Sequence, residues 1–272
     1  MRLLVVGLAA ALALVPAEAA RAANMTPAES RAAELALARG ALLYAYDRAA
    51  WVGTDDLKTK LPDYPSRVGG WIVDGPANAP QLVFFDKDEA EPRAVYLARF
   101  AESKLIEGRL LSAEDDRSLS PQRKALIAAL RAATAALVKR KVPLCKQASL
   151  NTVVLPPASP GAPTFVYFLT PQTDLKAIPL GGHYRVEVRP DGRAGTPRAF
   201  TNTCMEMPIE DEAGARPEAI GISHLLDKTP TEIHVFSALA ARLPLFVIVT
   251  KTGKLWSVEG NRMMILSDEV GR

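Results

Sequence analysis

The sequence predicts an α+β protein: a mostly antiparallel sheet flanked by two long amphipathic helices and a shorter C-terminal helix. Three observations support this class. Apolar residues recur at helical spacing in two long segments, and short β-branched or aromatic runs are separated by Gly, Pro, Asn and Asp. Most consecutive strand-like runs are joined by short turns, which is typical of antiparallel neighbours and not of a doubly wound parallel sheet.

The first helix is predicted to begin at Pro27. Thr26 is a good N-cap, Pro27 suits the first helical position, and Glu29 completes a capping box. Gly40 is expected to be a weak point, because glycine has a poor intrinsic helix propensity. The apolar face is predicted to contain Leu35, Leu42, Leu43, Tyr46 and Ala49.

A three-stranded antiparallel meander is expected over residues 71–75, 81–88 and 93–100. The second long helix is expected over 118–141, with Ser120 as its cap and Pro121 at its first position. Its apolar stripe is predicted to contain Leu126, Ile127, Leu130, Ala133, Leu137 and Val138.

The last third of the chain is expected to contain a hairpin, a strand, a helix and a final meander. The hairpin covers residues 181–204, with Cys204 ending its second strand, and an apolar strand follows at 219–226. Residues 231–243 fit a helix; the segment "EIHVF" alone also fits a strand, but Pro230 and the length of the pattern favour the helix. In the meander at 244–266, turns are predicted at Thr252-Gly253 and Gly260-Asn261.

Residues 1–22 have the order of a secretory signal peptide: Arg2, an apolar run from Leu3 to Val15, then small residues before a cleavage site. We therefore expect a soluble protein in the periplasm or secreted, with no transmembrane segment after cleavage. Residues 23–142 would form the N-terminal helix, the meander and the second helix. Residues 143–272 would form a C-terminal α+β part that packs with them as one domain.

Charge and cysteine content narrow the function. The formal net charge is +3 and no long basic block occurs, which argues against nucleic-acid binding. The only cysteines are Cys145 and Cys204, and an even pair in an exported chain predicts a disulfide. The alternative of a redox or metal-binding thiol lacks a CxxC spacing. P-loop and Rossmann fingerprints are also lacking.

All three histidines lie in the C-terminal half: His183, His224 and His234. If His224 ends a strand and His234 opens the next helix, their rings could face one another. Neutral imidazole binds zinc, and a third ligand could be Glu232, Asp227 or His183. The competing interpretation is structural, with each ring satisfying local hydrogen bonds, because HxH, HExxH and HxxxH spacings are missing. On this basis we assign neither a metal nor a cofactor.

The segment from His224 through Pro230, Thr231 and His234 resembles the second half of JAMM-type metallo-isopeptidases. The resemblance implies that His224 is a metal ligand, that Thr231 orients the oxyanion and that His234 replaces a ligand aspartate. Ile222 stands where the first ligand histidine would be.

A broader resemblance covers the last 130 residues or so. The segments "NTVVLPP", "LTPQT", "GGHYRVEV", "FTNTC", "HLLDKTPTEIHVF" and "PLFVIVT" are similar, in this order, to uncharacterised exported proteins of proteobacteria. This resemblance implies a fold family and a location, and no activity.

The sequence therefore favours an exported, non-catalytic binding or envelope-associated interaction protein, whose partner is an unidentified protein or small molecule of the cell envelope. The alternative is a divergent hydrolase, metal-dependent or not, that uses His224 and His234. A third hypothesis is assembly with a partner through the amphipathic first helix.

Overall fold

The computed structural model describes residues 25–268, and the signal peptide expected at residues 1–22 lies outside them. The helices of this range are α1 (Pro27–Lys60), α2 (Tyr64–Arg67), α3 (Pro121–Arg140) and α4 (Glu232–Ala241). The strands are β1 (Gly70–Asp74), β2 (Gln81–Phe85), β3 (Ala94–Ala101), β4 (Lys104–Leu110), β5 (Asn151–Leu155), β6 (Thr164–Leu169), β7 (Ala177–Pro179), β8 (Tyr184–Val188), β9 (Arg198–Ala199), β10 (Glu206–Pro208), β11 (Ile220–His224), β12 (Leu245–Val249), β13 (Lys254–Glu259) and β14 (Arg262–Ser267). None of the helices between residues 25 and 268 combines the length and hydropathy that a membrane span requires.

The strands form three four-stranded sheets and one two-stranded ribbon. The N-terminal sheet has the order β1-β2-β3-β4, the middle sheet β5-β6-β8-β9 and the C-terminal sheet β11-β12-β13-β14, while β7 pairs with β10. The α+β class is thus confirmed. The strands are divided among separate sheets, however, and do not form the single flanked sheet that we expected.

One strand pair departs from the antiparallel pattern. β11 pairs with β12 in parallel, with Ile220 opposite Leu245 and His224 opposite Val249. Parallel neighbours need a crossover connection, and α4 supplies it between the two strands. The predicted helix at 231–243 is confirmed by this element, so the alternative of a strand at "EIHVF" is wrong.

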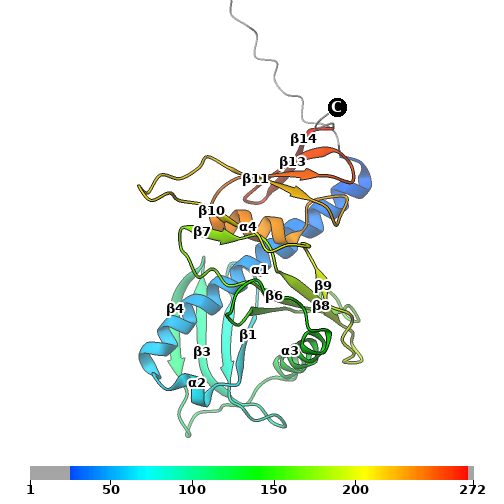
Figure 1. Ribbon diagram of the computed structural model, residues 1–272. Coiled ribbons are helices and arrows are strands. Elements are labelled where there is room, and N and C mark those ends of the chain that lie inside the picture. The colour runs from blue at the N-terminus through cyan, green and yellow to red at the C-terminus, as the bar shows by residue number, and fades with distance from the viewer. Residues whose placement is uncertain (1–24, 269–272) are drawn as a thin grey trace, which may run out of the picture.

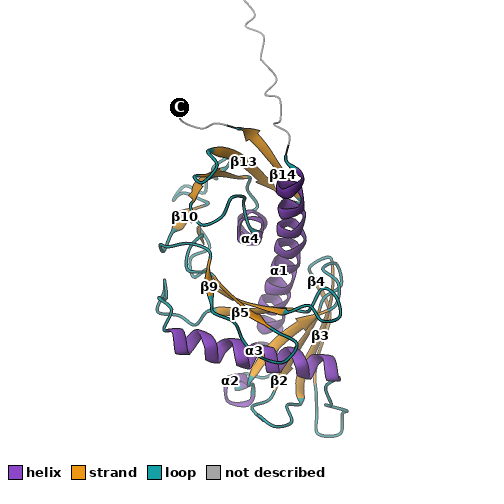
Figure 2. Cartoon of the chain, turned by 90° about the vertical axis from the view of Figure 1, so that its right-hand side faces the viewer, coloured by secondary structure: helices purple, strands orange, loops and turns teal. Residues whose placement is uncertain are grey.

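The long helix α1 connects the C-terminal sheet to the N-terminal sheet, as Figures 1 and 2 show from two directions. Its first turn has the predicted capping box between Thr26 and Glu29. Glu29 also receives a hydrogen bond from Lys254 of β13 at 2.8 Å. Near the other end, Asp56 accepts a hydrogen bond from Tyr96 of β3 at 2.5 Å. Each end of α1 is therefore hydrogen-bonded to a different sheet: Glu29 to the C-terminal sheet and Asp56 to the N-terminal sheet.

Gly40 lies in close contact with α4, and the expected weak point does not interrupt α1, which continues through it. A Cβ atom built on Gly40 would overlap Cβ of Val235 and lie 2.7 Å from the carbonyl oxygen of Glu232. Gly40 is buried, so the glycine allows two helix backbones to approach.

The N-terminal sheet contains a fourth strand, β4, which the sequence analysis missed. β4 is a largely exposed edge strand without a clear apolar alternation. The turn before it is formed by Glu102 and Ser103, which both have positive φ angles, 47° and 67°. Such turns normally carry Asn or Gly, so the sequence "AESK" contains no hairpin signal.

The predicted apolar stripes of the two long helices are largely buried, with one exception in each. Leu35 in α1 is 55% exposed and Val138 in α3 is 70% exposed. α3 packs against the middle sheet and β1; in its last turn Leu137 is buried in the core, whereas Val138 is on the exposed side.

The hydrophobic core joins the segments before and after residue 142. One cluster contains Leu43 and Phe84 from the first segment together with Tyr167 and Phe236 from the second.

Candidate functional site

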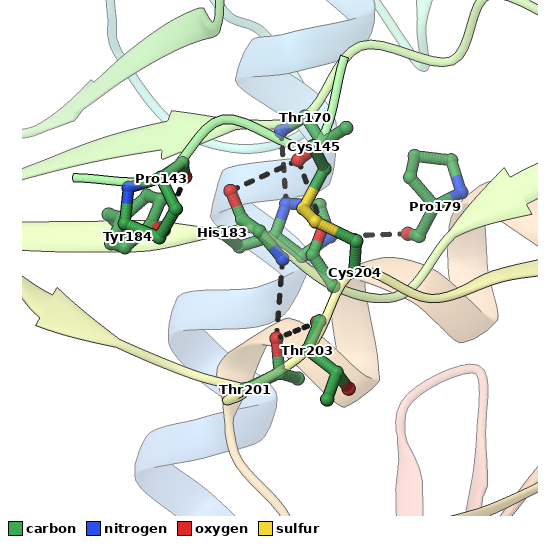
Figure 3. Close-up of a disulfide and its surroundings, with 11 residues drawn as sticks. Pro143, Cys145, Thr170, Pro179, His183, Tyr184, Thr201, Thr203 and Cys204 are labelled. Atoms are coloured by element: carbon green, nitrogen blue, oxygen red, sulfur yellow. Dashed lines mark hydrogen bonds between the residues drawn. A yellow bond between two sulfur atoms is a disulfide. The ribbon is translucent and has the colours of Figure 1, made fainter.

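Cys145 and Cys204 form the predicted disulfide. The Cα atoms are 5.3 Å apart and the bridge spans 59 positions of the sequence (Figure 3). Cys145 follows α3, as expected. Cys204 does not end a strand, because β9 is only two residues long and finishes at Ala199. The bridge therefore joins two loops beside the middle sheet.

His183 is a buried structural residue next to this disulfide (Figure 3). Its Nδ1 accepts a hydrogen bond from the backbone N–H of Thr170 at 3.2 Å, and its Nε2 lies 3.1 Å from the carbonyl oxygen of Pro179. Nε2 must then carry the proton that it donates. Burial lowers the pKa of His183 to about 4, so the ring is neutral at physiological pH. Both nitrogens are thus used locally.

His224 and His234 are brought together at the junction between β11 and α4. Their ring centroids are 4.6 Å apart and the ring planes are nearly perpendicular, at 82°. His224 is the last residue of β11, and His234 occupies the third position of α4. The two rings therefore lie close together, as predicted.

His234 forms an unusual capping box with Thr231. The backbone N–H of Thr231 donates to Nδ1 of His234 at 2.9 Å, and the Thr231 hydroxyl lies 3.0 Å from the same nitrogen. Histidine thus takes the role that Glu or Gln has in the common capping box. Burial, followed by the neighbouring charge of His224, lowers the pKa of His234 to about 3. The ring is neutral, with its proton on Nε2.

Asp227 links His224 to the middle sheet. Nε2 of His224 lies 3.0 Å from the carboxylate of Asp227 and 3.1 Å from its backbone nitrogen. A protonated Nε2 donates to the carboxylate, whereas a deprotonated Nε2 accepts from the backbone N–H, so the ring nitrogen makes one of these two hydrogen bonds at a time. The carboxylate also accepts a hydrogen bond from Arg198 at 2.7 Å. Burial by itself would raise the pKa of Asp227, but the hydrogen bond to His224 and the charge of Arg198 lower it below its ordinary value. Asp227 is therefore a carboxylate shared between an imidazole and a guanidinium.

Glu232 belongs to a separate buried network. It accepts hydrogen bonds from Tyr167 at 2.8 Å and from Arg185 at 2.6 Å. The guanidinium of Arg185 lies over the ring of Phe165, 4.8 Å from its centroid. This ion pair holds the N-terminus of α4 against β6 and β8, and it leaves Glu232 committed to Arg185.

The six candidate residues are therefore divided among three arrangements: the His224–Asp227–His234–Thr231 cluster, the Glu232 ion pair and the His183 contacts. Within residues 25–268, no three or more His, Cys, Asp or Glu side chains are grouped so that they could hold a metal ion. His224 and His234 are also buried, which leaves little of either ring open to a substrate. The cluster is well suited to fixing a strand-to-helix junction.

A cavity lies elsewhere, between α1, the C-terminal end of α4, β1, β2, and the segments that begin β5 and follow β6. Its volume is about 580 Å³, which is within the range of small-molecule sites, roughly 300–1,000 Å³. Six aromatic side chains line it: Tyr44, Trp51, Tyr64, Trp71, Phe84 and Phe236. None of the six candidate residues from the sequence is among the lining residues.

Asp47 is the one acidic residue that lines this cavity. Its carboxyl group is partly buried, and burial raises its pKa to about 6, although the charge of Arg48 and a hydrogen bond with Asn151 act in the opposite direction. Nearby, the indole nitrogen of Trp71 is buried without a hydrogen-bond partner in the described part of the chain. The aromatic wall therefore contains a partly buried carboxyl group and, behind the surface, an indole N–H without a partner among the described residues.

This site was not predicted, although the sequence contains a signal for it. The cavity-lining residues of α1 include Tyr44, Asp47, Arg48, Trp51 and Thr54. Tyr44, Asp47, Trp51 and Thr54 follow one another at intervals of three or four residues, with Arg48 next to Asp47, and so share one helical face. Polar and aromatic residues together on such a face could have been distinguished from the apolar stripe that packs in the core.

Comparison of the chain with protein-family models, with curated proteins and with solved structures found no match. The cavity and the histidine cluster are thus the observations on which a function can be argued.

Proposed function

We propose that this chain is an exported, non-catalytic binding protein that holds a small molecule in the cavity beside α1. The proposal rests on one observation: the cavity has both the size and the chemical lining of a small-molecule site. A space of about 580 Å³ is lined by six aromatic side chains and contains one acidic side chain. Ligand sites are typically concave and mostly apolar, with a few polar groups that orient the ligand.

The Cys145–Cys204 disulfide supports a location outside the cytoplasm. Together with the signal-peptide pattern of residues 1–22, it favours the periplasm or secretion. An envelope ligand, small molecule or protein segment, would reach the cavity there.

The test is binding of N-phenyl-1-naphthylamine, a neutral apolar fluorophore. We expect saturable binding at one site per chain. Ala240 lines the cavity near the end of α4, so Ala240→Phe should fill the space and abolish binding. Ala135→Phe is the matched control, because Ala135 is an exposed residue of α3 outside the cavity. Non-saturable binding, or equal binding by both variants, would refute the proposal.

A divergent hydrolase that uses His224 and His234 is the second candidate. It is favoured by the 4.6 Å separation of the two ring centroids and by the carboxylate of Asp227 beside His224. Metal analysis of untagged protein, with the double variant His224→Ala and His234→Ala as control, tests its metal-dependent form. Stoichiometric metal in the wild type alone would support the hydrolase, and no metal in either sample would argue against that form.

A further inference from the structure

Asp47 places a carboxylate in the cavity wall without a direct salt bridge in the described part of the chain. The charge of Arg48 acts on this carboxylate, but its side-chain hydrogen-bond partner is the neutral amide of Asn151. Arg48 is next in sequence, but its guanidinium lies over the ring of Trp51, 4.6 Å from the centroid. Partial burial of a charge without a direct salt bridge is unfavourable, so a cation from outside the chain would stabilise this carboxylate.

The aromatic side chains supply the second requirement for a cation. Trp51 and Tyr44 lie one helical turn from Asp47 on α1, and Trp71 and Phe84 come from the N-terminal sheet. Aromatic faces attract ammonium groups, most strongly where water is excluded, and they also contact an apolar body. The stacking of Arg48 on Trp51 shows that one of these rings already holds a cation.

Two further arginines line the cavity, and they differ from Asp47 in exposure. Arg216 and Arg242 are both exposed. Arg216 donates a hydrogen bond to the carbonyl oxygen of Ala241, at the end of α4. These positive charges are therefore close to solvent, where they are screened, whereas the acidic group is partly buried.

We propose that the cavity binds a small amphipathic amine, whose ammonium group pairs with Asp47 and whose apolar body lies against the aromatic side chains. This inference rests on the binding function proposed above and specifies its ligand class.

Three probes of similar shape test the charge preference: 2-phenylethylamine, 2-phenylethanol and 3-phenylpropanoate. Only the amine can pair a positive charge with Asp47, since the alcohol offers an uncharged hydrogen-bond donor. The amine should therefore bind about tenfold or more tightly than the alcohol, a difference of about 1.4 kcal/mol or more. Asp47→Asn should lower the affinity for the amine by about the same factor and leave the affinity for the alcohol nearly unchanged. Asp55→Asn is the matched control, because Asp55 is an exposed acid of the same helix.

The outcomes separate the two proposals. If the alcohol or the propanoate binds as tightly as the amine, or if Asp47→Asn binds the amine normally, the ligand class is wrong and the cavity remains a binding site. If neither the probes nor N-phenyl-1-naphthylamine binds, the binding function itself is refuted. Thermal unfolding of each variant establishes that it is folded, and Asp47→Glu, which retains the charge, should retain the preference for the amine.

Discussion

Gly40 in α1 lies directly against Val235 in α4, so that the two helix backbones approach without a side chain between them. This contact positions α4 and its histidine junction relative to the cavity-lining face of α1. Glycine usually makes a helix less stable than alanine does, but at this position we expect alanine to be the less stable residue.

Gly40→Ala should destabilise the protein. In an isolated helix alanine is better than glycine by about 1 kcal/mol, but here the added methyl would overlap Val235 and the Glu232 carbonyl. We expect a net loss of about 1–3 kcal/mol in the free energy of unfolding, as for overpacked cores, measured by urea denaturation. Gly221→Ala is the control, because a Cβ there has no atom within 4 Å. A stabilised Gly40→Ala variant would contradict the close helix contact.

Removal of the disulfide should lower stability strongly. The bridge closes a loop of 59 residues, for which the chain-entropy model gives about 4 kcal/mol. The double variant Cys145→Ser and Cys204→Ser should therefore unfold at a lower urea concentration. Thiol labelling of protein taken from the periplasm should detect no free cysteine, and two reactive thiols would show that the bridge does not form there.

His234 should make the protein sensitive to acid. Its folded pKa, about 3, is below the ordinary value of 6.5, so the unfolded chain binds a proton first and stability is lost as pH falls from 6.5 towards 3. The loss at about pH 4.5 should be roughly 2–3 kcal/mol. The groups that influence the ring are His224, Asp227, Thr231 and His183.

Urea unfolding at about pH 7.5 and 4.5 checks this prediction. His183, with a folded pKa of about 4, adds a further loss of stability over the same pH range. His234→Gln keeps a capping-box side chain and removes the titration, so it should resemble the wild type at the higher pH and lose less stability at the lower. An unchanged pH dependence in this variant would show that His234 is not the sensitive group.

Asp47→Asn should stabilise the ligand-free protein near pH 7.5. The folded pKa of Asp47, about 6, lies above its ordinary value of 3.8, so its contribution is favourable below 3.8 and is lost as pH rises through 6. The free energy of unfolding of Asp47→Asn should exceed that of the wild type by at most about 3 kcal/mol, since the carboxyl group keeps some contact with water. The other titratable or charged residues of the cavity are Tyr44, Arg48, Tyr64, Arg216 and Arg242.

Denaturation of wild type and Asp47→Asn from about pH 4 to 7.5 tests this trend. The advantage of the variant should shrink as pH falls, whereas Asp55→Asn should differ little from the wild type throughout, because exposed ion pairs contribute little. A constant difference between Asp47→Asn and wild type at all pH values would mean that Asp47 is not perturbed by its surroundings.

Local signals in the sequence predicted where the two long helices begin, the disulfide and most strands. Thr26, Pro27 and Glu29 predict the start of α1 because capping depends on groups within one turn. Pro230 and the helical period predict the helix at 231–243, which is α4, and turn residues predict the turns at Thr252-Gly253 and Gly260-Asn261. The approach of His224 and His234 was predictable too, since only a short loop separates them.

The tertiary structure alone decided the parallel pairing of β11 with β12, the role of Gly40, the edge strand β4 and the cavity. Each depends on contacts between residues far apart in the chain: Gly40 with Val235, and Asp47 with Asn151 and the aromatic side chains around it. A side chain's burial, and with it the pKa of Asp47, is set by those distant neighbours. Local periodicity cannot encode them, because the same helical face of α1 would be ordinary surface if β5 and α4 packed elsewhere.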